Sequence, residues 1–171
     1  AQQTSEPVQP THDGTRTAGV LLHPSSLPGN EPIGTLGAEA LAFLDWLDST
    51  GCSAWQVLPL CQTGPGHSPY SSPASFVGNP YLIDCASLAE VGLLTAEEVQ
   101  TLESSGTRLD YDALVTVKKP LLAAAAARFL ASPSHPWRSA YLQFESSSEW
   151  LADTALFLAL SEREMKPWWL W

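Results

Sequence analysis

The chain is poor in charged residues, above all in basic ones. Eight Lys and Arg side chains stand against 18 Asp and Glu, which gives a formal net charge of -10 at pH 7. Proteins bind nucleic acids and anionic membranes through clustered Lys and Arg. The composition therefore argues against both partners and fits a neutral ligand.

Long apolar segments and cysteine pairs are also missing. The best apolar run, residues 121–130, is about half as long as the roughly 20 residues that cross a bilayer. Residues 1–17 are polar throughout, unlike a secretory signal, and are expected to form a flexible tail. The cysteines are Cys52, Cys61 and Cys85. They form no CxxC pattern, so we expect reduced, partly buried thiols, no zinc site and a cytoplasmic location.

Motifs of several common enzyme classes are absent. The chain has no glycine-rich nucleotide-binding pattern and no G-x-S-x-G nucleophile elbow. Its histidines are His12, His23, His67 and His135. None is paired at metal-ligand spacing. We expect His12 and His135 to be solvated in loops. His67, next to Ser68, is expected to be exposed, with contact to a ligand as the alternative. His23 could support a site or make a local hydrogen bond.

Residues 18–58 predict a strand, a helix and a second strand. Apolar runs at 18–22 and 54–58 indicate buried strands, and the helix is expected over 38–49. Its apolar face comprises Ala40, Phe43, Leu44 and Leu47. A unit of this size is typical of a βαβ crossover with parallel strands. The segments that follow the strands, from His23 and from Pro59, should then meet at the carboxyl edge, where α/β proteins bind ligands.

The chain after Asp84 has a helical pattern with no evident strand. Thr95-x-x-Glu98 and Ser146-x-x-Glu149 both have capping-box spacing, and the second predicts a helix over 150–160. A further helix is expected over 110–130, broken or kinked at Pro120, before a turn at 132–137. Asp84 suits a helix cap or a turn, and Asp110 and Asp112 are expected to open the helix over 110–130, where the macrodipole favours acidic residues. Three tryptophans are expected in the core, namely Trp46, Trp55 and Trp150, and three in an exposed patch, namely Trp168, Trp169 and Trp171.

The loop after the second strand carries the candidate binding residues. It contains Ser68-Pro-Tyr-Ser-Ser72, which combines a ring with several hydroxyl groups. Sugars present flat C–H patches and a fringe of hydroxyls, so Tyr70 and Ser68 could stack on and hydrogen-bond to them. The alternatives are that Tyr70 packs on the core and that Ser68 only forms a turn. No pair of acidic residues suggests itself for glycoside chemistry.

Five motifs together resemble the 4-alpha-glucanotransferases, or amylomaltases, of glycoside hydrolase family 77. They are Arg16-Thr-Ala-Gly-Val-Leu-Leu-His-Pro-Ser-Ser-Leu-Pro28, Ile33-Gly-Thr-Leu-Gly37, Trp55-Gln-Val-Leu-Pro-Leu60, Ser68-Pro-Tyr70 and Gly78-Asn-Pro-Tyr-Leu-Ile-Asp84. Departures from the family pattern are Cys61, Gln62 and Ser71. The order and spacing of the motifs match, and the likeness covers nearly everything after the tail.

The resemblance implies an α/β fold, namely the N-terminal part of a (β/α)₈ barrel with a helical insertion, the barrel being incomplete in this chain. Residues 18–84 would form the first βαβ unit with the donor-subsite loop, and residues 85–171 a mainly helical insertion that is cut short. The reaction implied is retaining transfer of α-1,4-glucan segments between maltooligosaccharides, with glucose as an acceptor and no metal or organic cofactor. The catalytic carboxylates would lie beyond residue 171, so no catalytic residue is assigned. Ser68 and Tyr70 match positions that line the donor subsites.

Overall fold

The computed structural model describes residues 16–102 and 108–171, so nearly all of the expected tail over residues 1–17, and His12 with it, falls outside the described residues. The helices and strands in chain order are β1 (Gly19–Leu21), α1 (Ala38–Ser49), β2 (Ala54–Gln56), α2 (Cys85–Glu90), α3 (Ala96–Gln100), α4 (Tyr111–Ala131), α5 (Arg138–Ser147) and α6 (Leu151–Glu164). Short 3₁₀ helices occupy Pro24–Ser26, Pro65–His67, Pro80–Leu82 and Trp168–Leu170. None of the described helices is long and apolar enough to cross a membrane.

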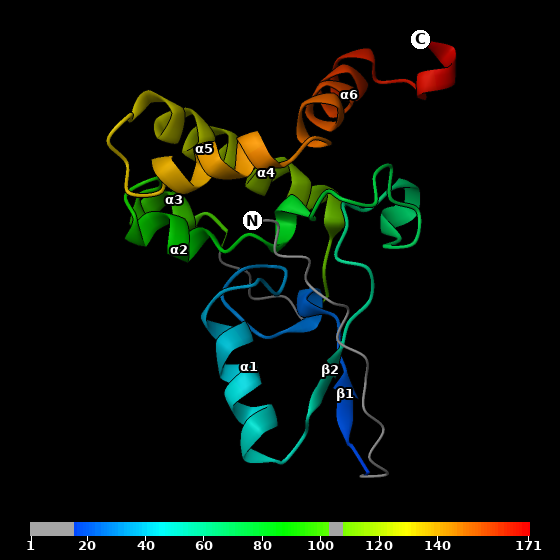
Figure 1. Cartoon of the computed structure of the whole chain (residues 1–171), viewed down its shortest axis with the longest axis vertical. Helices are drawn as coiled ribbons and strands as arrows, with labels where there is room; N and C mark the ends of the chain where they lie inside the picture. Colours follow the sequence, from blue (N-terminus) through cyan, green and yellow to red (C-terminus); the bar gives the residue numbers. More distant parts are fainter. Residues whose placement is uncertain (1–15, 103–107) are drawn as a thin grey trace, which may run out of the picture.

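The strands β1 and β2 are parallel neighbours joined by α1, as the apolar runs predict (Figure 1). Val20 pairs with Trp55 at the centre of the ladder. Gly19 permits this approach, because a Cβ atom there would lie 2.6 Å from the carbonyl oxygen of Ala54. Gly51 follows α1 with a φ of 73°, the left-handed conformation that glycine adopts without strain. The βαβ unit is therefore confirmed, but the strands are shorter than predicted. They are also not buried as predicted, since in each strand the central residue is half-buried and the two others are exposed.

Helix α1 buries a narrower face than its periodicity predicts. Ala40 and Leu47 are buried, and Phe43 packs edge-on against Trp55 with ring centroids 4.9 Å apart. Leu44 is exposed, and Trp46 is 49% exposed rather than part of the core. Both predictions were wrong because a two-stranded sheet offers α1 only a narrow surface to cover.

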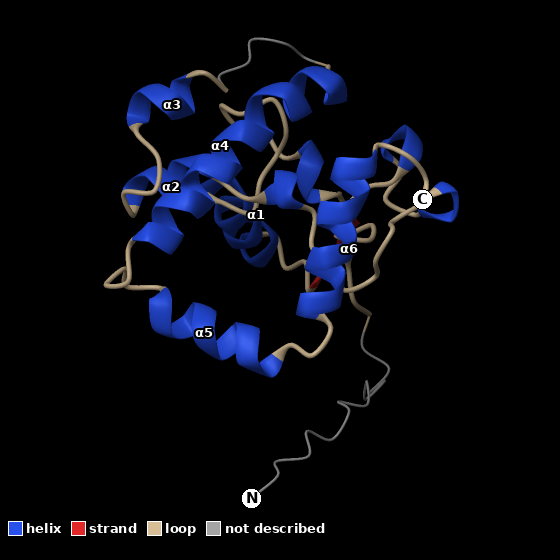
Figure 2. Ribbon diagram, turned by 90° about the horizontal axis from the view of Figure 1, so that it is seen from above, coloured by secondary structure: helices blue, strands red, loops and turns tan. Residues whose placement is uncertain are grey.

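Helices α2 to α6 lie beyond the carboxyl ends of β1 and β2, whereas α1 runs beside the strands (Figures 1 and 2). In the described part of residues 85–171 there is no strand. The apolar core of this region consists of Cys85, Leu93, Leu94, Leu102 and Ala125. The described chain is thus a partial α/β structure with a helical layer at one end of its sheet.

The helix caps agree with the sequence at three sites and differ at one. Thr95 and Glu98 form a reciprocal capping box, and the carboxylates of Asp84 and Asp110 accept hydrogen bonds from the first turns of α2 and α4. Ser146, by contrast, lies inside α5, and α6 begins after Trp150 with no side-chain cap. The capping prediction there was wrong, since its spacing falls across the end of α5, a helix that we did not predict.

Helix α4 continues through Pro120 without a break. Proline removes one helical hydrogen bond, but its fixed φ is that of a helix. Buried contacts at Leu114 and Lys118 before it and at Ala125 after it hold both halves of α4 against neighbouring segments. Tertiary packing therefore overcomes the expected interruption.

Candidate functional site

The segments that follow the two strands meet at one edge, as the parallel arrangement predicts. The indole Nε1 of Trp55 donates to the carbonyl of Leu22 at 2.7 Å, just where β1 ends. His23 accepts a hydrogen bond from the backbone of Ser25 at 3.2 Å through Nδ1, which is the local role left open above. Burial lowers the pKa of His23, and the Pro59 carbonyl acts in the opposite direction. His23 thus lies beside Ser25 in the segment after β1 and beside Pro59 in the segment after β2.

A closed loop projects from this edge after β2. Its base is an antiparallel bridge between Cys61 and Gly78, flanked by a 3.0 Å hydrogen bond from the Gln62 amide to Val77 and a 2.8 Å bond from the Asn79 amide to Leu60. We call residues 62–77 the sugar loop, after the role predicted for it. In Figure 1 it is the coil at the right, above the strands. The thiol of Cys61 also donates to the carbonyl of Ser75 at 3.2 Å, so backbone bonds and one side chain close the loop.

The tip of the sugar loop is a tight turn. The amide of His67 donates to the carbonyl of Gly64 at 3.0 Å. A Cβ atom at Gly64 would lie 1.8 Å from the carbonyl oxygen of Ser71, so only glycine allows the two arms of the turn to come so close. The hydroxyl of Ser71 donates to the carbonyl of Ser68 at 3.2 Å.

This turn places the two predicted binding residues close together, but they differ in solvent exposure. Tyr70 is 74% exposed, so the alternative that it packs on the core is wrong. The Ser68 side chain is half-buried, and its oxygen accepts the amide of Tyr70 at 3.3 Å, which is a turn-forming contact. The arrangement offers a ligand a bare phenol ring beside hydroxyl groups. That either residue binds a sugar stays a prediction.

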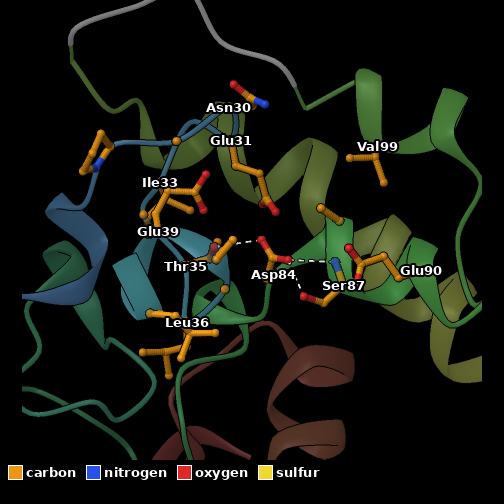
Figure 3. Close-up of a pocket in the computed structure, with 17 residues that line it drawn as sticks. Asn30, Glu31, Ile33, Thr35, Leu36, Glu39, Asp84, Ser87, Glu90 and Val99 are labelled. Carbon is orange, nitrogen blue, oxygen red and sulfur yellow. Dashed lines mark hydrogen bonds between the residues drawn. The ribbon is translucent and has the colours of Figure 1, made fainter. Parts of the chain in front are cut away.

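A cavity of about 370 Å³ with a mixed polar and apolar lining lies between the segment after β1, helix α1 and helix α2 (Figure 3). Asp84 stands at its centre and accepts hydrogen bonds from the Thr35 hydroxyl at 3.0 Å and from the Ser87 amide and hydroxyl at 2.7 and 2.6 Å. Burial opposes the charged form of this carboxyl, yet these hydrogen bonds and the nearby Lys118 hold its pKa below the usual range. Asp84 is thus a helix cap, as its position predicts, and its hydrogen bond from Thr35 also joins the segment after β1 to α2, which was not predicted.

Glu31, on another wall of the cavity, was missed by sequence reasoning. One carboxylate oxygen accepts the amide of Cys85 at 2.8 Å, and the other pairs with the fully buried ammonium of Lys118 at 2.5 Å. Lys118 also donates to the carbonyl of Tyr81 at 2.9 Å. These contacts fasten the segment after β1 to α2 and α4. No local pattern could have found them, because the partners are far apart in the chain.

Two further histidine and cysteine predictions have a structural outcome. His135 is buried instead of solvated, because its ring packs edge-on against Phe129 at 5.1 Å and its Nδ1 accepts the Trp137 amide. All three cysteines are free thiols as predicted, and Cys85 is fully buried. Within residues 16–102 and 108–171, no group of three or more His, Cys, Asp or Glu side chains could hold a metal ion.

The comparisons with known proteins agree with this architecture. The profile of a family described as 4-alpha-glucanotransferase matches residues 22–171. The 4-alpha-glucanotransferase of Thermus thermophilus is 46% identical over 146 residues, which are 85% of this chain and 29% of the relative. The chloroplastic/amyloplastic enzyme of Solanum tuberosum is 41% identical over 152 residues, covering 85% and 26%.

A solved structure, the amylomaltase from Streptococcus agalactiae in complex with acarbose, superposes with a TM-score of 0.79 at 37% identity. The superposed region covers 87% of this chain and 30% of the amylomaltase chain. The chain therefore spans less than a third of the length of the relatives it matches. From the profile match, the identities and the shared fold together, the chain belongs to the 4-alpha-glucanotransferase family.

Proposed function

We propose that these residues supply the first strands of a (β/α)₈ barrel in a 4-alpha-glucanotransferase. Residues 18–84 would be the first βαβ unit and residues 85–171 a helical insertion. Parallel β1 and β2, with α1 between them, support this reading. A barrel of this type takes about 250 residues, so 171 residues cannot close one and also hold the insertion.

The proposed substrates are α-1,4-glucans and maltooligosaccharides, with glucose as an acceptor. Neither a metal nor an organic cofactor is required, and the protein would act in the cytoplasm without nucleic acid or membrane partners. The structural relative was solved with acarbose bound. The observation that carries the proposal is the bare ring of Tyr70, 74% exposed on a loop fixed at the carboxyl edge of the strands. There it could stack on a sugar while Ser68 and its neighbours offer hydroxyl groups.

The proposed chemistry is retaining transfer, which needs two carboxyl groups about 5–5.5 Å apart. Several acids of the described residues already have structural partners: Glu31 with Lys118, Asp84 with Ser87, Glu98 with Arg128 and Asp110 with the first turn of α4. We therefore place the catalytic carboxylates in the part of the relatives that this chain does not match, and assign no catalytic residue here.

Disproportionation of maltotriose tests this division of labour. The purified 171-residue chain should release no glucose above a blank, since it would bind sugar without the acids that break the bond. A full-length relative serves as the positive control. Turnover by the chain alone would show that its own residues carry the chemistry.

Affinity electrophoresis in gels that contain amylose tests the sugar loop. Tyr70→Ala should lose the retardation of the wild type, and Tyr70→Phe, which keeps the ring, should retain most of it. Trp169→Ala is the matched control, because Trp169 is also an exposed aromatic side chain but lies near the end of the described chain. Equal losses of retardation in Tyr70→Ala and Trp169→Ala would mean that exposed rings contribute wherever they lie and that the loop has no special role in binding.

A second candidate function is non-catalytic glucan binding, favoured by the same exposed ring. It predicts that amylose gels retard this chain as strongly as they retard a full-length relative. The further alternative, an inactive product that does not fold stably, is favoured by the exposed apolar side chains Trp168, Trp169, Leu170 and Trp171. Cooperative thermal unfolding of the chain would argue against that alternative.

A further inference from the structure

The sugar loop contacts the helical layer through two rings. Phe76, near the base of the loop, stacks against Trp150 just before α6, with ring centroids 6.1 Å apart. The second contact is at the tip. His67, at the tip of the loop, lies flat against Tyr111, the first residue of α4, with ring centroids 4.3 Å apart and planes inclined by 10°. His67 directly precedes Ser68 in the sequence. Its ring contact therefore acts on the very turn that presents the predicted binding residues.

The backbone at the tip shows that the turn is not relaxed by itself. Gly66 has a φ of 72° and His67 a φ of 56°, and the left-handed conformation is uncommon for a residue with a side chain. Such a conformation persists where the surroundings determine it. The stack on Tyr111 holds the His67 ring at this point of the turn. Burial raises the pKa of the Tyr111 phenol.

Charge contributes less to this contact than the rings do. The Nε2 of His67 lies 3.8 Å from a carboxylate oxygen of Asp112, whose side chain is 98% exposed. Arg108 and Asp110 also line the hollow beside the imidazole and bring charges of opposite sign. An exposed pair at this distance is screened by water and worth little. The parallel stack of two rings is the interaction that depends on geometry.

We propose that His67 is a positioning residue, and that its stack on Tyr111 fixes the sugar loop so that Ser68 and Tyr70 meet the glucan in one arrangement. This inference rests on the proposed glucan binding by the loop. It requires an aromatic ring at position 67 and not an imidazole as such. Neither His67 nor Tyr111 needs to touch the sugar.

Amide hydrogen exchange tests the positioning without any ligand. In His67→Ala the amides of residues 67 and 71, which close the turn, should exchange about three- to tenfold faster than in the wild type, whereas His67→Phe should restore protection. The ring protons of His67 should show the ring-current shift of a stacked imidazole and lose it in Tyr111→Leu. Unchanged exchange in His67→Ala would overturn the proposal.

Amylose-gel affinity of the same variants tests the consequence for binding. His67→Ala and Tyr111→Leu should each bind about three- to tenfold more weakly, and their combination no more weakly than either one. Asp112→Asn is the matched control and should stay within about twofold of the wild type. If Asp112→Asn matched the loss and His67→Phe failed to rescue, the charge and not the stack would position the loop, and the inference would be wrong.

The two proposals fail in different ways. If the wild-type chain is not retarded by amylose, glucan binding by this chain is refuted, while the exchange and ring-current results still decide whether His67 positions the loop. If the wild type binds and His67→Ala binds equally well, only the positioning role falls. Should His67→Ala not fold, His67→Phe and Tyr111→Leu provide the same comparison.

Discussion

The pair of Glu31 and Lys118 should be the contact whose loss most weakens the fold. Lys118 is fully buried and Glu31 is 9% exposed, with 2.5 Å between the ammonium nitrogen and a carboxylate oxygen. The second carboxylate oxygen holds the Cys85 amide, and the ammonium also reaches the Tyr81 carbonyl. The pair thus joins the segment after β1 to α2, α4 and the short helix before α2.

Lys118→Met keeps much of the side-chain volume and removes the charge. The Glu31 carboxylate would then be buried with a single remaining donor, the amide of Cys85. Breaking one half of a buried ion pair costs about 3–5 kcal/mol, because the other charge is left uncompensated. With an unfolding slope of about 2 kcal/mol per molar urea, the midpoint should fall by about 2 M.

The double variant Glu31→Gln with Lys118→Met separates the buried charge from the packing. Glutamine keeps an acceptor for the Cys85 amide and buries no charge, so the double variant should lose only about 0–2 kcal/mol. Lys119→Met is the matched control, because its pair with Glu162 at 3.0 Å is exposed and should contribute about 0–1 kcal/mol. Tryptophan fluorescence in urea measures all three. A loss below about 1 kcal/mol in Lys118→Met, or a double variant no more stable than Lys118→Met, would refute the reasoning.

Two other predictions concern titratable groups. Arg128 donates to both carboxylate oxygens of Glu98 at 2.7 Å, and these bonds together with the Thr95 amide lower the pKa of Glu98 to about 2 from a reference value of 4.5. Because the pKa of Glu98 is depressed in the folded state, its contribution to stability is present above about pH 4.5 and is lost as pH falls through 2. The urea midpoints of the wild type and Glu98→Gln should therefore differ at pH 6 and converge near pH 2. A constant difference across that range would contradict the assignment. Burial raises the pKa of the Cys85 thiol to about 12, so iodoacetamide at pH 8 should alkylate the half-buried Cys52 and Cys61 first, as mass spectrometry of tryptic peptides can show, and early labelling of Cys85 would disprove its burial.

The parts of the fold that sequence could predict are those with a local signal. The strands near residues 19 and 55 are continuous apolar runs, α1 has a helical period, and Thr95 with Glu98 is a capping box within four residues. Helix α5 was not predicted, although Trp137, Tyr141 and Phe144 fall at the spacing of one helix face. Its place is set by Tyr141, whose ring packs edge-on against Phe129 of α4 at 5.4 Å.

The errors in burial have the same origin. His135 sits in a proline-rich turn, which alone predicts exposure, yet the rings of Phe129 and Trp137 enclose it. Trp46 lies near the apolar stripe of α1. It stacks on Phe43, with ring centroids 5.5 Å apart, and stays half exposed. Whether a side chain is covered depends on segments distant in the chain, and single-sequence patterns do not contain that information.

The candidate site was likewise predictable only where the sequence carries a local signal. The motif Ser68-Pro-Tyr70 identifies the loop and its residue types, but its exposure and its anchoring follow from Gly64 against Ser71 and from His67 against Tyr111. None of these pairs has a pattern that could be recognised in advance.

The sugar loop therefore separates the groups that shape it from the groups that it presents. Backbone hydrogen bonds from the Gln62 and Asn79 amides close its base, and these do not depend on side-chain identity. This explains why Gln62 can depart from the family pattern while the loop remains closed. The thiol of Cys61 adds a hydrogen bond of its own, to the carbonyl of Ser75 at 3.2 Å. At Gly64 the closely spaced arms of the turn leave no room for a side chain. Tyr70 carries no part of the closure, and a ring left 74% exposed on a closed loop is available to a ligand.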